Sequence, residues 1–148
     1  MSIVKIIVES YTFETVPQRD FIASFQVIGK TKGTLADQEG CRFGANPDDL
    51  TTVTVPLNQS VSIDEFDANS FIIYRDGSGS NIRWRPQSVA VYGVDASNTR
   101  HLLCNVLPWP ASAPWIGVGP DAVASVTLGQ YSQAPTFSAK PSGPRMCT

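Results

Sequence analysis

Charge, histidine and cysteine are all scarce in this 148-residue sequence. Charged residues make up 16% of the chain, below the ~25% typical of soluble domains, and the net charge at pH 7 is −2. The 11 basic residues are scattered rather than gathered into a stripe or a cluster. This distribution argues against a nucleic-acid-binding domain, and against a membrane binder that depends on a polybasic patch.

Long hydrophobic runs are missing as well. The sequence holds no run of about 18 apolar residues, so it predicts no membrane-spanning helix. The N-terminal sequence MSIVKIIVES lacks the charged segment and long apolar segment of a signal peptide. We therefore expect a cytoplasmic protein, or one that is exported by a route without such a peptide.

The three cysteines are Cys41, Cys104 and Cys147. Their wide spacing contains no CxxC pair and no cysteine–histidine ligand pattern, which argues against a structural zinc site. Cys104 follows two leucines and is predicted to be a small buried hydrophobic residue. A Cys41–Cys104 disulfide is an alternative, but we predict a reducing compartment and free thiols.

Catalytic motifs are also absent from the sequence. The single histidine, His101, lies in a predicted strand with no serine or cysteine nucleophile in an activating motif beside it. The GxSxG turn of serine hydrolases does not occur. We predict that the protein is not an enzyme and that His101 is satisfied by water or by backbone groups.

Short strands separated by turns dominate what is present. Hydrophobic residues make up 42% of the chain, enough for a core, and 11 glycines and 11 prolines supply turns. The pattern predicts an all-β fold, a single antiparallel β-sandwich of about eight strands with long loops in residues 1–129. Residues 130–148, rich in proline and serine, are predicted to form an extended or disordered tail. The expected strands are 3–8, 20–28, 51–57, 61–66, 71–74, 88–94, 100–106 and 124–128.

Two segments are predicted to be connections between strands. Residues 9–19 are mostly polar and contain Pro17. Residues 29–46 contain four glycines and form a loop in this interpretation. Loops of that length are uncommon unless they are functional, so residues 29–46 are one candidate working surface.

A group of oxygen-bearing side chains flanks the strand at 71–74. Carboxylate, hydroxyl and amide oxygens close together in a turn are the ligands that Ca²⁺ prefers, and Gly77 and Gly79 give the turn backbone freedom. The alternative is that these residues only make a turn between two strands, and the spacing does not match an EF-hand loop. Calcium is the one cofactor that the sequence suggests. The candidate ligands are Asp64, Asp67, Asp76 and Asn81, with Ser78 and Ser80 beside them.

A proline-rich segment near residue 110 carries the candidate contact residues for a ligand or partner, Trp109, Trp115 and Ile116. Tryptophan on a stiff loop can stack on a sugar ring or insert at a lipid headgroup boundary, because the indole is amphipathic. In the alternative interpretation Trp109 covers the open end of the sandwich and Trp115 packs beneath the tail.

Trp84 lies between Arg83 and Arg85, so strand alternation places the indole and the two guanidinium groups on opposite faces. We predict a core tryptophan beneath a solvated face. A phosphate-binding role for Arg75, Arg83 and Arg85 is a minority alternative.

The run from Phe71 to Trp109 resembles the second half of a PLAT/LH2 domain, and the strands at 3–8 and 20–28 are similar to the opening of that family. The likeness covers roughly residues 3–109. It implies an eight-stranded antiparallel β-sandwich that binds lipid, membrane or protein through its end loops, sometimes with Ca²⁺, and without catalysis. The matching residues are Asp76 and Gly79 in a turn, Trp84, Val89 and Val91 in the strand after it, and the closing Trp109.

Together these features predict a non-catalytic binding module that docks on a lipid or membrane surface, or on a protein partner, through its end loops. A structural or assembly subunit of the coat, tail or decoration type is the first alternative, and it leaves a homo-oligomer open. A glycan-binding lectin that uses the same tryptophans is the second.

Overall fold

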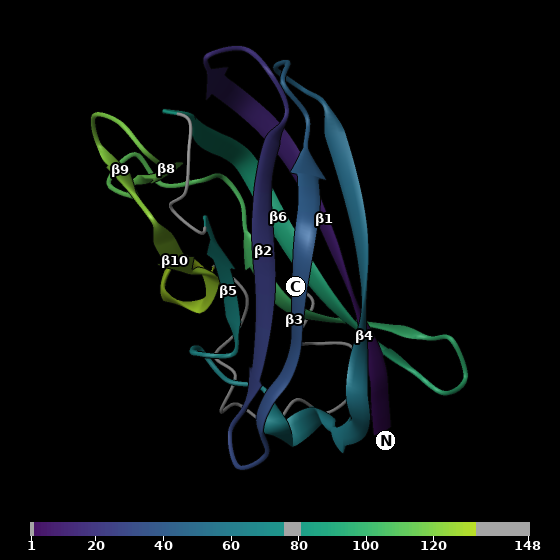
Figure 1. Ribbon diagram of the computed structural model, residues 1–148. Coiled ribbons are helices and arrows are strands. Elements are labelled where there is room, and N and C mark those ends of the chain that lie inside the picture. The colour runs from purple at the N-terminus through teal and green to yellow at the C-terminus, as the bar shows by residue number, and fades with distance from the viewer. Residues whose placement is uncertain (1, 76–80, 133–148) are drawn as a thin grey trace.

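The computed structural model describes residues 2–75 and 81–132, which form two packed β-sheets (Figure 1). The predicted all-β sandwich is confirmed, and the described residues contain no α-helix, only two 3₁₀ turns, η1 (Ile63–Glu65) and η2 (Leu128–Tyr131). None of the helices in the described residues is long and apolar enough to cross a membrane. The strands are β1 (Ser2–Val16), β2 (Phe21–Gly29), β3 (Gly33–Phe43), β4 (Leu50–Ser62), β5 (Phe71–Tyr74), β6 (Arg83–Asp95), β7 (Arg100–Val106), β8 (Trp115–Gly117), β9 (Ala122–Val123) and β10 (Ser125–Thr127).

The larger sheet has six strands in the order β4-β1-β6-β8-β9, with β7 paired to another part of β6. Strand β1 lies between β4 and β6 and is antiparallel to both. Its residues 9–16, predicted to be a connection, continue the strand to Val16. The β8–β9 pair is parallel, which departs from the purely antiparallel prediction.

The smaller sheet has the order β10-β5-β2-β3. Strand β2 follows the predicted alternation, because Phe21, Ala23, Phe25 and Val27 are all buried. The prediction of a long loop at residues 29–46 is wrong, because most of this segment is strand β3, which pairs with β2 along its length. Only the β2–β3 turn and the segment after Phe43 are loops there.

The core between the sheets is organised around Trp84, which is fully buried as predicted. Its ring stacks on those of Phe43 and Phe21, with centroids 4.4 and 5.6 Å apart. The indole Nε1 donates a hydrogen bond to Thr12 Oγ1 at 3.0 Å, so the one polar atom of the ring is satisfied inside the core.

The chain passes from sheet to sheet at both ends of the sandwich. At one end, at the top of Figure 1, the β1–β2 turn (residues 17–20) and the β3–β4 loop (residues 44–49) lie together. We call it the loop end. At the opposite end lie the N-terminal residues of β1, the β2–β3 turn and η1, and we call it the hairpin end.

Candidate functional site

The predicted calcium ligands do not come together in the described residues. Asp64 lies in η1 at the hairpin end, and Asp67 lies in the turn that follows it. Asn81 is exposed and comes two residues before β6 begins, at the other end of the sandwich. Asp76, Ser78 and Ser80 lie outside the described residues.

The strand register shows how far apart these ligands are. On β1, Ser2 pairs with Ser62 just before η1, whereas Val16 pairs with Arg83 just after Asn81. At about 3.3 Å per residue the two ends of β1 are more than about 40 Å apart. Asp64 and Asn81 therefore cannot share one ion. Across residues 2–75 and 81–132, no group of three histidine, cysteine, aspartate or glutamate side chains could hold a metal ion.

Two of the three predicted contact residues are buried in the core. Trp109 is 5% exposed and Ile116 is 0% exposed. The Trp109 indole donates to the backbone oxygen of Pro114 at 3.1 Å, and its ring lies 5.9 Å from that of Tyr131. The expectation that these side chains form an exposed surface is therefore not met, and Trp109 covers the core as the alternative interpretation had it.

Trp115 is half-buried, and an arginine already lies over its ring. The guanidinium carbon of Arg83 lies 4.3 Å from the Trp115 ring centroid, and Nη1 of the same group donates to Pro120 O at 2.7 Å. Arg85 donates to the backbone oxygens of Pro110 and Ala113. Both arginines thus fasten the segment between β7 and β9 to β6.

His101 pairs with a carboxylate that was not anticipated. Its Nε2 lies 2.9 Å from Asp95 Oδ2, while Asp95 Oδ1 accepts the backbone N–H groups of Ser97 and Thr99. The hydrogen bond from His101, followed by that from Thr99, lowers the pKa of Asp95 below its usual value. The pair closes the β6–β7 turn at the hairpin end, where Asp95 pairs with Ile3 near the start of β1.

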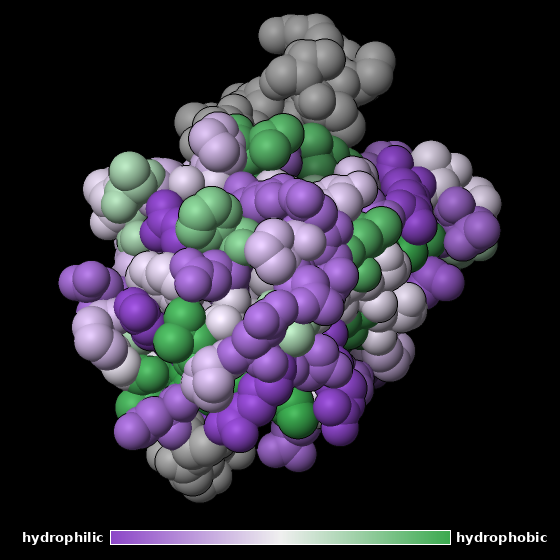
Figure 2. Space-filling model, turned by 90° about the horizontal axis from the view of Figure 1, so that it is seen from above, coloured by the Kyte–Doolittle hydropathy of each residue, from purple (hydrophilic) through white to green (hydrophobic). Residues whose placement is uncertain are grey.

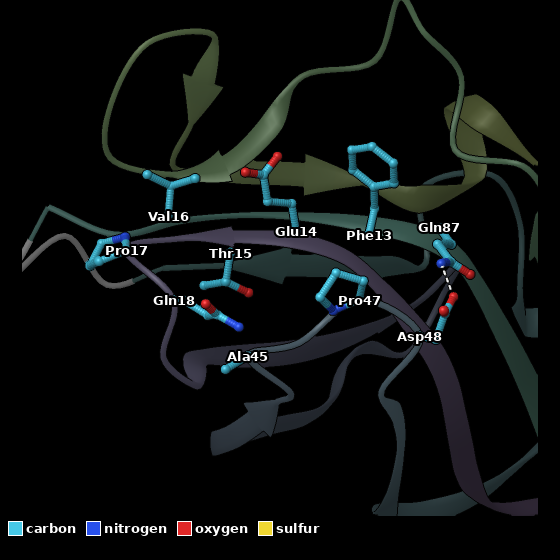
Figure 3. Close-up of a pocket in the computed structure, with 10 residues that line it drawn as sticks. All are labelled: Phe13, Glu14, Thr15, Val16, Pro17, Gln18, Ala45, Pro47, Asp48 and Gln87. Carbon is cyan, nitrogen blue, oxygen red and sulfur yellow. Dashed lines mark hydrogen bonds between the residues drawn. The ribbon is translucent and has the colours of Figure 1, made fainter.

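The cavity that the sequence did not reveal lies at the loop end (Figure 3). It has a volume of about 620 Å³, within the range of ligand-binding pockets. We call it the loop-end pocket. Its lining residues come from the end of β1, the β1–β2 turn, the β3–β4 loop and β6. They are Phe13, Glu14, Thr15, Val16, Pro17, Gln18, Ala45, Pro47, Asp48 and Gln87.

Two irregularities in the sheet produce this pocket. The β1–β6 register shifts on both sides of Thr12, which leaves Phe13 on β1 and Gln87 on β6 without a paired residue. A β-bulge of this kind redirects side chains and increases the local twist. As a result the consecutive residues Phe13 and Glu14 both face outward from β1, between the buried Thr12 and Thr15 (Figure 3).

Hydrogen bonds hold the β3–β4 loop against β1 and so fix the walls of the pocket. Thr12 N–H donates to Asp49 O at 3.0 Å, and Asp48 N–H donates to Thr12 O at 2.8 Å. The hydroxyl of Thr12, besides accepting from Trp84, donates to Gly44 O at 2.9 Å. On the far side, Gln87 Nε2 donates to Asp48 Oδ1. Thr12 therefore links the core to the loop that forms one wall of the pocket.

The pocket offers an apolar surface with an acidic edge. Phe13 is 49% exposed and Val16 36% exposed, so both present apolar surface to the cavity. The charged residues of its described lining are Glu14 and Asp48, both acidic. Such a site can bind an apolar group flanked by cations or by amide donors.

The sequence held a weak signal for this site. Phe13 and Val16 lie in segment 9–19, which the sequence predicts to be a polar connection. The apolar residues of this segment follow neither a strand period nor a helix period. The candidate working surface at residues 29–46 fits in part, because Ala45 lines the pocket.

The chain gives no significant match to any protein-family model, to any curated protein or to any solved structure. The structure shows an all-β two-sheet domain. No family match supports the PLAT/LH2 likeness specifically.

Proposed function

We propose that this protein is a non-catalytic binding module whose loop-end pocket takes an apolar side chain of a protein partner. The observation that carries the proposal is the exposure of Phe13 and Val16 in a cavity whose walls are held by backbone hydrogen bonds. A preformed apolar cavity with few polar groups is the usual form of a binding site. Apolar side chains that stay solvated contribute no burial energy to the fold, and a partner that covers them gains about 25 cal/mol per Å² of apolar area buried.

The surface beside the pocket supports a protein partner. Tyr11, 43% exposed, pairs across the larger sheet with Leu50, 54% exposed. These side chains extend the apolar area beyond the pocket on the outer face of that sheet. A protein interface needs such an area, whereas a single small ligand does not.

Charge favours protein over the lipid and glycan alternatives. An anionic membrane would be repelled by Glu14 and Asp48, and the described lining of the pocket contains no lysine or arginine to attract it. Figure 2 looks down on this end, where hydrophobic side chains lie scattered among hydrophilic ones. The glycan alternative depended on Trp109 and Trp115, which are buried or covered by Arg83.

We also propose that the chain is a PLAT/LH2-like domain in its framework. What supports this is that Trp84, Val89 and Val91 are buried in β6, where the family places its core strand, and that Trp109 closes the segment after β7. The matching turn residues Asp76 and Gly79 lie outside the described part of the chain. In that family, binding through end loops is the common use of the fold.

The proposal is tested by selecting a random peptide library on the immobilised full chain. We expect enriched peptides with one large apolar residue next to a basic residue, because the pocket combines an apolar floor with two carboxylates. Replacing Phe13 by serine should weaken the selected peptides at least tenfold, measured by fluorescence anisotropy.

The matched control is Val123→Ser, because Val123 is also an exposed apolar residue, 40% exposed, but lies outside the pocket. It should leave peptide binding unchanged. The proposal fails if no peptide is enriched, or if both variants weaken binding equally. Flotation with phosphatidylserine vesicles provides the lipid comparison, and binding there that depends on Phe13 would favour a membrane instead.

A further inference from the structure

A particular occupant for the loop-end pocket is suggested by the last part of the chain. Residues 133–148, QAPTFSAKPSGPRMCT, carry Lys140 and Arg145 and no acidic side chain, although the chain as a whole has a net charge of −2. They also contain three prolines and one aromatic residue, Phe137. This composition is complementary to an apolar pocket whose charged lining residues are acidic.

The described chain ends at residues that are linked to the pocket. Tyr131 packs on Trp109, and the backbone N–H of Trp109 donates to the backbone oxygen of Gln87 at 2.8 Å. Gln87 is one of the pocket residues. Ser132 is fixed in turn, because its hydroxyl bonds both the N–H and the C=O of Asn105 on β7. The last described residue is therefore held on β7, the neighbour of the pocket-lining strand β6.

The remaining length is sufficient to reach the pocket. Asn105 pairs with Ala90 on β6, which is three residues from Gln87, and β1 is the next strand. At about 3.3 Å per residue and about 4.8 Å per strand, the distance from Ser132 to Phe13 is about 20 Å. Sixteen extended residues span up to about 50 Å, so residues near Phe137 and Lys140 can lie there.

We propose that residues 133–148 occupy the loop-end pocket of their own chain, with Phe137 against Phe13 and Lys140 beside Glu14. Proline-rich segments lose little conformational entropy on binding and dock on surfaces lined by aromatic side chains, which Phe13 and Tyr11 provide here. Attachment to the same chain gives the segment a millimolar effective concentration. The proposal rests on the proposed function in using the same pocket, and it implies that an outside partner must displace this segment.

The test places a nitroxide spin label on Cys147 of the full-length, ¹⁵N-labelled protein. The other two cysteines, Cys41 and Cys104, are buried, so the label is selective. We expect paramagnetic broadening of the amide signals of residues 13–16, 18 and 48, with the β2–β3 turn at residues 30–32 unaffected. Glu14→Lys should at least halve the broadening, and 1 M salt should reduce it, because the Debye length falls to about 3 Å.

Dilution and a mixed sample distinguish binding of the segment within one chain from binding between two chains. Broadening that is independent of concentration, and absent from a ¹⁵N-labelled protein mixed with spin-labelled ¹⁴N protein, supports the proposal. A flat profile, a different location, or broadening that needs a second molecule would overturn it. If the library selection yields peptides but the spin label causes no broadening, only the inference about residues 133–148 is contradicted. If the spin label causes the expected broadening but no peptide is enriched, the proposed function as a binding site for a protein partner is contradicted.

Discussion

Thr12 is the residue that connects the hydrophobic core to the pocket. Its buried hydroxyl accepts from Trp84 in the core and donates to Gly44, the first residue of the loop that forms one wall. Thr15, also buried, donates to the same Gly44 oxygen at 3.3 Å, but it is Thr12 and not Thr15 that accepts the Trp84 Nε1–H. These threonines take inward positions that a regular strand would give to apolar residues, and hydrogen bonds compensate for their burial.

Replacing Thr12 by valine should lower the free energy of unfolding by about 1–3 kcal/mol, because the Trp84 Nε1–H is left buried without an acceptor. Thr15→Val is the matched control and should cost less than about 1 kcal/mol, since Gly44 O keeps its bond to Thr12. Urea unfolding followed by tryptophan fluorescence measures both. Equal losses for the two variants would contradict the role assigned to Thr12.

At the scale of strands, the sequence predicted regular elements well and irregular ones badly. Strand β2 alternates strictly and was predicted with nearly correct bounds. The second half of β1 was missed because the bulge at Phe13 interrupts the alternation, and because polar threonines face inward there. Strand β3 was missed because it is an edge strand whose middle, residues 37–40, is exposed and shifts register against β2, so little in its own sequence requires burial.

The candidate site could be predicted only in its chemistry, not in its location. The sequence indicated end loops with apolar contact residues, but it could not show which aromatic residue remains exposed. Trp109 is buried, its ring packs on Tyr131, which is distant in sequence, and its indole N–H bonds to Pro114 O. Phe13 is exposed because of a register shift between two strands distant in sequence.

Strand β8 depends on one glycine. Gly117 pairs with Arg83 at φ +127°, and a Cβ there would lie 2.2 Å from the backbone oxygen of Ile82. Gly117→Ala should cost about 3 kcal/mol, because both the backbone conformation and the contact are unfavourable. Gly33→Ala is the control: its φ is +73° but no atom lies within 4 Å, so about 1 kcal/mol is expected. Thermal unfolding of both variants checks this, and a milder effect at Gly117 would contradict it.

The sandwich shields the sulfur atoms of Cys41 and Cys104. Cys41 in β3 and Cys104 in β7 are free thiols on different sheets, and both are buried. Burial raises the pKa of Cys41 and raises that of Cys104 to about 12. Because the thiolate is the reactive form, a raised pKa leaves almost none of it at pH 8.

We therefore expect a thiol reagent at pH 8 to leave Cys41 and Cys104 unmodified in the native protein and to modify both in 6 M guanidinium chloride. Peptide mass mapping after labelling identifies the sites. Between pH 8 and pH 10 the native rate at Cys104 should stay limited by unfolding of the sandwich. Rapid modification of either residue under native conditions would show that the sheets separate more easily than their packing indicates.

The position of β1 between β4 and β6 has a consequence for the order in which the protein is made. Val8 pairs with Val53 on one side and Val91 on the other, so β1 is synthesised before both of its partner strands. Until β6 has been synthesised, the apolar segment IVKIIV has an unpaired edge, and pairing between such distant strands is slow. Newly made chains are therefore most exposed to association with one another during synthesis, before β1 has found its second neighbour.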